Sequence, residues 1–407
     1  MSERVDTSCC VVGGGPAGMM LAFLLARAGV DVVVMEKHAD FFRDFRGDTI
    51  HPSTLQLMYE LGLLAQFLKL PHHKLHKITA RIGGVVIPVG DFTHLPVQCP
   101  YIAIMPQWDF LNFLAEQSKR YPTFKLMMQT EGTDLVSEGG AVVGVKAKTP
   151  QGEVEVRAPL VVACDGRHST MRTCAGLAVE NLGVPMDVLW FRLRYDPNDP
   201  YDGFGYLSAG SILVTINRGD YWQCAYVIPK GSFDALRERG LDNFRDQIVQ
   251  IQPRFQDRVA EIADWNAVKL LEVRVDRLKR WHKPGLLLIG DAAHAMSPIG
   301  GVGVNLAIQD AVASANALAA PLCANTINED VLSQIQRRRE LPTIVTQRLQ
   351  IFVQNMVVGK ILATREKTMQ PPSFTKLLTM FPALQRLPAR LVGMGVRPEH
   401  VHTPAAV

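Results

Sequence analysis

The glycines near the start of the chain have the spacing that says most about chemistry. The segment Gly13-Gly14-Gly15-Pro16-Ala17-Gly18 follows a short apolar run, Cys9 to Val12, and precedes residues that can form an apolar helix. A G-x-G-x-x-G sequence between a strand and a helix is typical of a βαβ unit that binds the pyrophosphate of a dinucleotide. In such a unit Gly13 permits the tight turn, Gly15 lets the backbone approach the phosphates, and Gly18 lets the helix pack closely on the sheet.

An acidic residue follows at the position that this unit requires. A second apolar run, Val32 to Met35, ends at Glu36, and the acid of this motif lies about 20 residues beyond the glycines. Its carboxylate can accept hydrogen bonds from ribose hydroxyls, and its charge disfavours a ribose 2′-phosphate. The glycines, the helix and Glu36 together predict a site for FAD or NAD, and they are less typical of a glycine-rich turn that binds nothing.

The composition is that of an ordinary globular enzyme. The 407 residues exceed the usual size of one domain, so we expect two lobes. A formal net charge of +4 is too small to indicate nucleic acid as a partner. The seven cysteines are scattered without C-x-x-C spacing, which indicates neither disulfides nor zinc and favours the cytoplasm. We find no signal-peptide core in Met1 to Thr7 and no apolar run of about 18 residues that would span a bilayer.

The middle of the chain has a different pattern. From about Asn181 to Val268, helical periodicity is scarce and short aromatic strands dominate, such as Trp190 to Tyr195 and Trp222 to Ile228. This pattern predicts a separate antiparallel sheet. The chain then returns to a continuous apolar run, Gly285 to Gly290, of the kind found in buried parallel strands.

Two further motifs accompany the glycine-rich one. Cys164-Asp165-Gly166-Arg167-His168-Ser169 follows the buried run Leu160 to Ala163, and Gly290-Asp291-Ala292-Ala293-His294 continues through Asn305. The three motifs, in this order and at these intervals, resemble the single-component FAD-dependent aromatic hydroxylases of the para-hydroxybenzoate hydroxylase family. The resemblance extends over most of residues 8 to 340 and is weakest in the middle region.

The resemblance implies roles for individual residues. Asp291 resembles the family's aspartate that binds the ribityl chain of FAD, and Pro298 resembles the proline beside the reacting edge of the flavin. Arg46 and Gln107 resemble an arginine and a glutamine that touch the cofactor. Asp165 belongs to a second fingerprint that the family associates with both FAD and the nicotinamide donor.

The turn from Gly300 to Asn305 leads into a segment rich in small residues that can form a helix. Its free N–H groups can stabilise negative charge on N1 and the C2 oxygen of a reduced flavin. The residues that we expect to contact the cofactor are Gly13, Gly15, Pro16, Ala17, Gly18, Glu36, Lys37, Arg46, Gln107, Asp165, Gly166, Gly290, Asp291, Pro298, Gly301, Gly303, Val304 and Asn305. Those that we expect at the reacting end are Pro298, His51 and Arg46.

The family's mechanism implies an activity. NADH or NADPH reduces FAD, dioxygen adds at flavin C4a, and the resulting hydroperoxide transfers a hydroxyl group to an electron-rich ring. This chemistry requires a dry pocket, because water would break down the intermediate. We therefore expect a monooxygenase that takes a small apolar aromatic substrate, such as a phenol, a quinone-like compound, a quinolone or a polyketide. No metal is expected.

Other activities share this scaffold. The main alternative is a flavin-dependent reductase or dehydrogenase. A flavin-dependent halogenase is disfavoured because the sequence has no W-x-W-x-I-P stretch. A binding protein that has lost its chemistry is disfavoured because Asp291, Pro298 and the turn from Gly300 to Asn305 are all present.

These observations predict an α/β fold. We expect a Rossmann-like FAD-binding domain of the glutathione-reductase type, with an inserted antiparallel β-sheet substrate domain and a C-terminal helical segment. The expected boundaries are 1–72, 100–178 and 268–340 for the FAD-binding domain, 73–99 and 179–267 for the substrate domain, and 341–407 for the helical tail.

Several histidines have simpler explanations than catalysis. His294 belongs to the Asp291 motif, where packing and hydrogen bonding are the favoured roles. His51 follows the Arg46 loop and can face the flavin or the substrate, or it can simply flank a helix. His72, His73 and His76 are close in sequence but lack acidic or cysteine partners at ligand spacing, which favours a solvated loop. The list of candidate bases is therefore short.

The C-terminal segment is basic and apolar. Residues 356–407 contain seven lysines and arginines against two glutamates, among many Leu, Met and Phe residues. Such a segment can lie on an anionic membrane as a peripheral contact. It can equally pack on the FAD-binding lobe, which we favour, or form a dimer contact. Monomer and homodimer both stay open.

Overall fold

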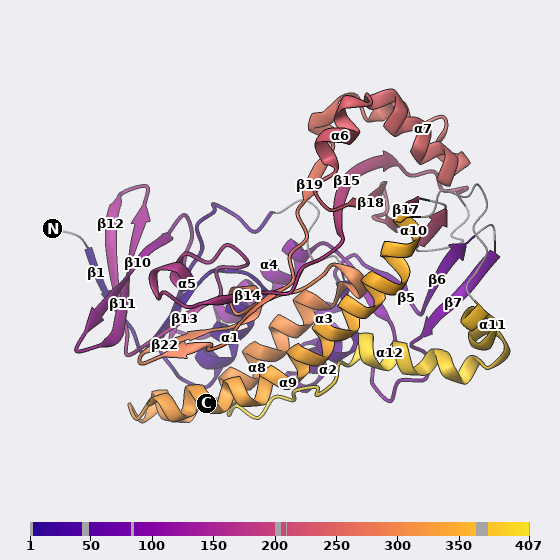
Figure 1. The fold of residues 1–407 in the computed structure, drawn as a ribbon. Helices are drawn as coiled ribbons and strands as arrows, with labels where there is room; N and C mark the ends of the chain where they lie inside the picture. The colour runs from indigo at the N-terminus through magenta and orange to yellow at the C-terminus, as the bar shows by residue number, and fades with distance from the viewer. Residues whose placement is uncertain are drawn as a thin grey trace.

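The structure, a computed structural model, describes residues 3–42, 49–82, 85–199, 205–208, 210–363 and 373–406. Figure 1 shows a central sheet with its helices, flanked on the left by a small sheet and on the right by a larger one. The arrangement confirms the predicted α/β fold class with an inserted, mainly antiparallel sheet.

The central sheet has six strands in the order β21-β22-β13-β2-β3-β9, and all neighbouring pairs except β21–β22 are parallel. The strands β2, β3, β13 and β22 are buried along their whole length, as the continuous apolar runs predict. The bounds are β21 (His282–Lys283), β22 (Leu286–Leu288), β13 (Leu160–Ala163), β2 (Cys9–Val12), β3 (Val32–Met35) and β9 (Phe124–Met127).

Each face of the central sheet packs on a different layer. In β2, Cys9 and Val11 face a core built with helices, whereas Cys10 and Val12 face a core built with a second sheet. This alternation follows from the two-residue period of a strand. The helices of the first layer are α1 (Pro16–Arg27), α2 (Pro52–Glu60), α3 (Leu64–Phe67), α4 (Gln107–Ser118) and α8 (Val302–Cys323). The second sheet has the order β1-β12-β11-β10, with bounds β1 (Glu3–Asp6), β12 (Gly152–Arg157), β11 (Ala141–Thr149) and β10 (Glu131–Glu138).

The long helix α8 is a core helix. Residues 299–323 are long and apolar enough to cross a membrane, and they form the one segment in the described part of the chain that meets this test. However, 72% of the apolar window is buried inside the protein, where α8 packs between α1 and α9 (Glu329–Val353). Its apolar character therefore follows from internal packing.

The larger sheet has seven strands drawn from two parts of the chain, in the order β19-β15-β18-β17-β16-β6-β7. All its pairs are antiparallel except β16–β6. The bounds are β19 (Lys269–Leu271), β15 (Met186–Arg194), β18 (Tyr221–Pro229), β17 (Ser211–Asn217), β16 (Gly205–Ser208), β6 (Lys77–Ile82) and β7 (Val85–Asp91). Smaller three-stranded sheets join the layers: β4 (Thr49–Ile50), β8 (Ile102–Ile104) and β5 (His73–Leu75), and β14 (Val179–Asn181), β20 (Asp276–Leu278) and β23 (His294–Ala295).

Two helices cover the outer face of the seven-stranded sheet, where helical periodicity was expected to be scarce. They are α6 (Phe233–Glu238) and α7 (Leu241–Ile251), two helices that the sequence analysis did not place in this region. The signal was present: Phe244 and Ile248, four residues apart, are fully buried on one face of α7. They pack on Phe191 and Tyr226 of the sheet.

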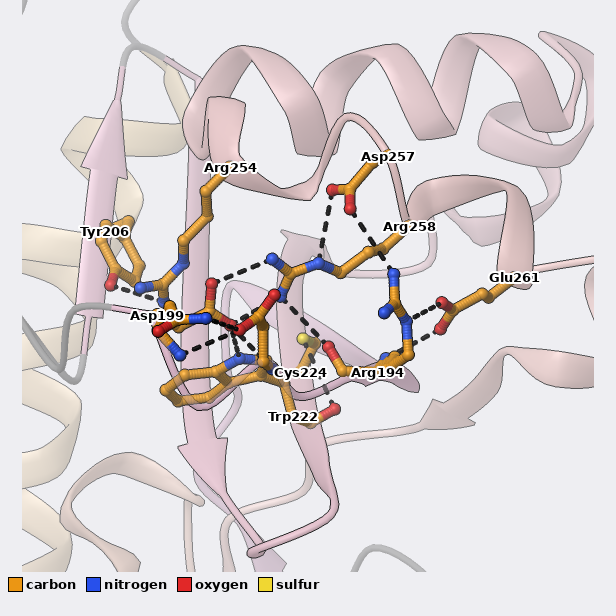
Figure 2. Close-up of polar contacts among 11 residues, drawn as sticks. Arg194, Asp199, Tyr206, Trp222, Cys224, Arg254, Asp257, Arg258 and Glu261 are labelled. Carbon is orange, nitrogen blue, oxygen red and sulfur yellow. Dashed lines mark hydrogen bonds and ion pairs between the residues drawn. The ribbon is translucent and has the colours of Figure 1, made fainter.

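A network of buried charges fixes the end of β15 to the turns after α7 (Figure 2). Arg258 donates from Nη1 and Nη2 to the two carboxylate oxygens of Asp199, at 2.6 and 2.9 Å, and Trp222 Nε1 donates to Asp199 at 2.7 Å. The side chains of Asp199 and Arg258 are 5% and 6% exposed. Burial opposes ionisation of Asp199, but these bonds and the Arg258 charge outweigh it and lower its pKa to about 2.

The C-terminal helices contact both the central sheet and the seven-stranded sheet. The α9 helix begins at Glu329 and continues past residue 341, where the sequence predicted the start of a tail, so no break separates the two. A π-helical turn (Gln354–Val358) and α10 (Gly359–Ala363) follow, then α11 (Ser373–Met380), the short turn η7 (Pro382–Gln385) and α12 (Arg386–Gly393). The last residues return to the central layer, where Arg27 donates to the carbonyl of Thr403 at 2.9 Å.

The Asp199–Arg258 pair gives a stability prediction. In Asp199→Asn, Arg258 stays buried without its carboxylate, so we expect a loss of about 3 kcal/mol of unfolding free energy near neutral pH. Because the pKa of Asp199 is lowered to about 2, its contribution is complete above the ordinary pKa of about 4 and disappears as the pH falls from there through about 2. Urea unfolding of both proteins across that range measures the effect. A difference between wild type and variant that does not shrink on acidification contradicts this account.

Candidate cofactor and substrate site

A cavity of about 640 Å³ lies where the central sheet meets the seven-stranded sheet. Its central-sheet side is formed by the turns that follow β2, β3 and β13 and by the segment from Asp291 to the start of α8. Its other side is formed by side chains of β15, β17 and β18 that point inward. The cavity therefore joins a polar end, made by strand-end turns, to an end made by a β-sheet.

The turn between β2 and α1 depends on the absence of side chains. Gly13 has φ +106°, and a Cβ there would lie 2.5 Å from the carbonyl oxygen of Cys164. A Cβ on Gly18 would lie 2.0 Å from the carbonyl oxygen of Gly13. Gly15 differs, because its Cβ would meet nothing within 4 Å and would project at the cavity lining. Gly13 and Gly18 thus serve the fold, and Gly15 leaves space for a ligand.

Glu36 ties the end of β3 to this turn. Its Oε2 accepts from the N–H of Gly14 at 3.1 Å, and its Oε1 accepts from the backbone N–H and the Nδ1 of His38, at 3.0 and 2.5 Å. Glu36 is 8% exposed and lines the cavity together with Lys37 and His38. The carboxylate is thereby held in place beside the glycine turn, where a ribose hydroxyl can donate to it.

The second and third motifs are bonded to each other. Arg167 Nη2 donates to Asp291 Oδ2 at 3.4 Å, and Arg172 donates to the carbonyls of Ala292 and Arg167, at 3.2 and 2.7 Å. Burial raises the pKa of Asp165, which accepts from the N–H of Met171 at 3.1 Å. Both motifs therefore form one wall, although more than a hundred residues separate them.

The start of α8 is built on a left-handed turn. Gly300 and Gly301 have φ +77° and +62°, and a Cβ on Gly301 would lie 2.4 Å from Thr49 Oγ1. Asn305 braces this turn, since its Nδ2 donates to the carbonyls of Thr49 and Gly301 and its Oδ1 accepts from His51 N at 2.9 Å. The first helical residues, including Gly303 and Val304, line the cavity, and α8 has no side-chain cap. Its N-terminus can therefore stabilise an anion there.

Three glutamines on one face of α9 and the π-helical turn hold the segment that precedes this turn. Gln347 Nε2 donates to the carbonyl of Ala295 at 3.1 Å. Gln350 accepts from the N–H of Ser297 at 3.2 Å and donates to the carbonyls of Ser297 and Ile299, at 3.0 and 2.9 Å. Gln354 Nε2 donates to Ser297 Oγ at 2.5 Å. All three are buried, so the backbone on both sides of Pro298 is fixed.

A buried chain of charges lies behind Asp291. Asp310 of α8 accepts from the N–H of Gly290 at 3.1 Å, from His294 Nε2 at 2.6 Å and from Arg339 Nε at 2.9 Å. Arg339 also reaches Glu399 at 3.1 Å, near the C-terminus. Burial opposes ionisation of Asp310, but His294 and Arg339 outweigh it and lower its pKa. This chain joins the C-terminal segment to the loop that carries Asp291.

Most residues predicted to contact a cofactor line the cavity. These are Gly13, Gly15, Pro16, Ala17, Glu36, Lys37, Gln107, Asp165, Gly166, Asp291, Pro298, Gly301, Gly303 and Val304. Gly18, Gly290 and Asn305 are not in the lining and support it from behind. Arg46 lies outside the described residues.

His51 does not line the cavity. It is the N-cap of α2 and is fully buried, and its Nδ1 donates to the carbonyl of Val392 in α12 at 2.7 Å. Burial lowers its pKa to about 4. The structure therefore places His51 between the Asn305 brace and the C-terminal helices, away from the space in which a substrate would lie.

Sequence reasoning missed the residues that act from behind the lining. The spacing of Gln347, Gln350 and Gln354, which puts three amides on one helical face, was the available signal. Arg172 and Asp310 gave no comparable signal, because each looks like an ordinary helix residue until its partners are known. Within the described residues, no group of three or more His, Cys, Asp or Glu side chains could hold a metal ion.

Comparison with known proteins gives the family. The family model described as FAD binding domain matches residues 6–348. The 6-methylpretetramide 4-monooxygenase of Streptomyces rimosus is 33% identical over 360 residues, which is 88% of this chain and 86% of that protein. The para-nitrophenol 4-monooxygenase of Pseudomonas sp. (strain WBC-3) is 25% identical over 321 residues, 76% of this chain and 77% of that protein.

The fold has solved counterparts. The anhydrotetracycline hydroxylase OxyS from Streptomyces rimosus has a TM-score of 0.75 at 22% identity, over 97% of this chain and 77% of that one. The fold and the cavity define a flavoprotein oxidoreductase. The chain belongs to the FAD binding domain family and is an FAD-dependent monooxygenase of the aromatic-hydroxylase kind, as its sequence motifs predicted.

The residues present fit FAD. A turn without side chains opens toward the cavity at Gly15, Glu36 is fixed beside it, and the uncapped start of α8 faces the same space. These features match a pyrophosphate, a ribose and the electron-rich edge of a reduced flavin, in that order. The cavity then continues beyond them, between the inward strands of the larger sheet.

Two glycine variants separate ligand space from protein packing. Gly15→Ala has room in the protein, so we expect an unchanged melting temperature of the FAD-free protein and FAD binding at least about tenfold weaker, because the methyl group takes phosphate space. Gly18→Ala meets the Gly13 carbonyl at 2.0 Å, so the FAD-free protein should itself be destabilised. Flavin fluorescence titration and thermal unfolding measure both effects. If Gly15→Ala bound FAD like wild type, the phosphate assignment would be wrong.

Proposed function

We propose that this enzyme hydroxylates an uncharged, fused-ring aromatic compound. The observation that carries the proposal is the continuity of one cavity from the dinucleotide-binding turn to a chamber with apolar walls. The described side chains of that chamber are Leu75, Ile78, Ile102, Met186, Val188, Trp190, Ile212, Val214, Ile216, Ala225, Val227, Leu271 and Val358.

The apolar chamber supports a neutral substrate. Charged groups lose hydration on burial and need partners, and none of these described side chains carries a charge. A substrate with a carboxylate would leave that group unpaired there. A substrate whose polar groups sit at the flavin end, and whose rings contact the sheet, fits the distribution of lining residues. The relative from Streptomyces rimosus is named a 6-methylpretetramide 4-monooxygenase, and this name is consistent with a polyketide substrate.

The lining of the cavity supports a set of cofactor contacts. We propose that the turn around Gly15 holds the pyrophosphate of FAD, that Glu36 and Lys37 contact the adenosine part, and that Asp291 and Gln107 contact the flavin half. Bound FAD supplies the redox and oxygen-transfer chemistry, with NADH or NADPH as the electron donor and dioxygen as co-substrate. The protein's part is to orient the rings, exclude water and stabilise charge with the free N–H groups of α8.

Pro298 is proposed to lie beside the reacting edge. It lines the cavity, and its carbonyl accepts from Gly301 N at 3.0 Å, which closes the turn into α8. Gln350 holds the carbonyls of the residues on both sides of Pro298. Gln350 is thus a positioning residue that sets where Pro298 and the helix N-terminus lie relative to the flavin.

Gln350 gives a prediction about coupling. Gln350→Glu keeps an acceptor for Ser297 N but removes the donors to the carbonyls of Ser297 and Ile299. We expect about a tenfold fall in hydroxylation rate, with dioxygen diverted to hydrogen peroxide, because small displacements of positioned groups are costly. FAD affinity should change far less. The yields of hydroxylated product and of hydrogen peroxide per dioxygen consumed measure this coupling.

A matched control is available on the same helix. The side chain of Gln336 also makes hydrogen bonds to backbone groups. It accepts from Trp281 N and donates to the carbonyl of Lys279, each at 2.9 Å. Gln336→Glu should therefore affect stability alone and leave the coupling ratio unchanged. Equal loss of coupling in both variants would assign Gln350 a general structural role.

The domain boundaries and the location of the enzyme in the cell are also proposals. We propose that residues 1–72, 100–178 and 268–340 form the FAD-binding domain, that 73–99 and 179–267 form the substrate domain, and that the enzyme acts in the cytoplasm.

A flavin-dependent reductase or dehydrogenase on the same scaffold is distinguished by rapid mixing of the reduced protein with dioxygen. The monooxygenase should show a transient absorbance before oxidised flavin returns, whereas direct reoxidation supports the alternative.

Substrate class is tested by assay. Neutral fused-ring phenols should stimulate NAD(P)H oxidation and gain one oxygen atom by mass spectrometry, whereas benzoates should do neither. Ala225 faces the chamber and is 4% exposed, so Ala225→Phe should raise the KM for a fused-ring substrate about tenfold by occupying ring space, with FAD content unchanged. Hydroxylation of benzoates in preference to neutral rings contradicts the proposal.

A further inference from the structure

The C-terminal helices expose an apolar surface at one edge of the seven-stranded sheet. We call it the apolar rim and define it by eight residues that are all between 36% and 71% exposed. They are Val85, Val86 and Val89 of β7, Leu377 and Met380 of α11, Phe381 after it, Leu384 of η7 and Leu387 of α12. Figure 1 shows α11 and α12 beside β6 and β7. Single exposed apolar residues are ordinary, but a group of this size on adjoining elements indicates a contact surface.

The rim is held from the inside. In α12, Ala389 is 1% exposed and lies against Gly90 of β7, and Gly393 is buried so tightly that a Cβ there would lie 3.0 Å from Leu95. The outward residues of the same helix are Leu387, 64% exposed, and the exposed Arg386 and Arg390. The helix therefore has one face fixed in the protein and another that is apolar and cationic.

The charge around the rim has one sign. Residues 377–398 contain three cations, Arg386, Arg390 and Arg397, and no aspartate or glutamate. On the neighbouring strand, Asp91 is buried and already paired with Lys77 at 3.2 Å. Exposed Leu, Met and Phe side chains flanked by arginines are the composition of a segment that lies in the interface of an anionic bilayer.

We propose that the apolar rim binds an anionic lipid surface peripherally. A second copy of the chain fits less well, because a two-fold contact through this rim would bring Arg386 and Arg390 of both copies together without acidic partners. The proposal goes beyond the proposed function and does not depend on it.

The position of the apolar rim suggests how binding to a lipid surface would serve the enzyme. The core beneath α12 joins Ala389 to Ile78, Trp190 and Ile216, and these three residues also line the cavity. One hydrophobic cluster thus connects the lipid-facing helix to the apolar chamber. An apolar substrate that partitions into a bilayer would be concentrated near this wall.

Vesicle binding by the FAD-loaded, full-length protein tests the proposal. Wild type should co-sediment with vesicles of phosphatidylcholine mixed with phosphatidylglycerol, less with phosphatidylcholine alone, and less at high salt. The triple variant Phe381→Ser/Leu384→Ser/Leu387→Ser and the double variant Arg386→Glu/Arg390→Glu should each bind at least about tenfold more weakly. The matched control is Leu270→Ser, since Leu270 is 39% exposed on β19, at the opposite edge of the same sheet.

The outcomes are distinguishable. Absence of wild-type binding, or equal binding by wild type and both rim variants, overturns the proposal. Light scattering that shows a dimer dissociated by the rim variants, without vesicle binding, assigns the rim to a second copy. Because binding is measured without turnover, a failure to find hydroxylation would leave this result unaffected. Retained FAD absorbance in the variants shows that they are folded.

Discussion

The register of the parallel strands is the constraint on which the site depends. Ala163 of β13 is paired with Val12 of β2 and with Leu288 of β22, and Val12 is paired with Met35 of β3. The carboxyl ends of these strands therefore meet at one edge, and each is followed directly by a turn of the cavity wall. Ligands of open α/β sheets bind at that edge because the strand ends direct backbone N–H groups and helix N-termini there.

The turns are held mainly by polar groups that do not line the cavity. Asn305 braces the start of α8, three glutamines of the α9 region hold the Pro298 segment, and Asp310 holds the N–H of Gly290. Each of these side chains is buried and makes at least one of the hydrogen bonds described above, so displacement would leave polar groups without bonds. The C-terminal segment joins this support, because Glu399 pairs with Arg339 at 3.1 Å.

The seven-stranded sheet performs two separate tasks with its two faces. Residues such as Val214 face the cavity, whereas their neighbours in sequence, such as Leu213, face a core with α6 and α7. The outer core is further fixed by the Asp199–Arg258 pair. The outer core supports the inner face, whose cavity-lining side chains are apolar, as suits oxygen chemistry on a flavin.

The sequence by itself determined the glycine turn, Glu36 and the order of the three motifs, because each depends on local spacing: a tight turn, a strand end and a helix start. Tertiary structure alone decided that His51 lies behind the site, which backbone groups Gln350 and Asp310 hold, and which face of the sheet α6 and α7 cover. Those contacts join residues far apart in the chain, and no short-range pattern specifies which buried polar groups will meet. Packing of the whole fold selects them.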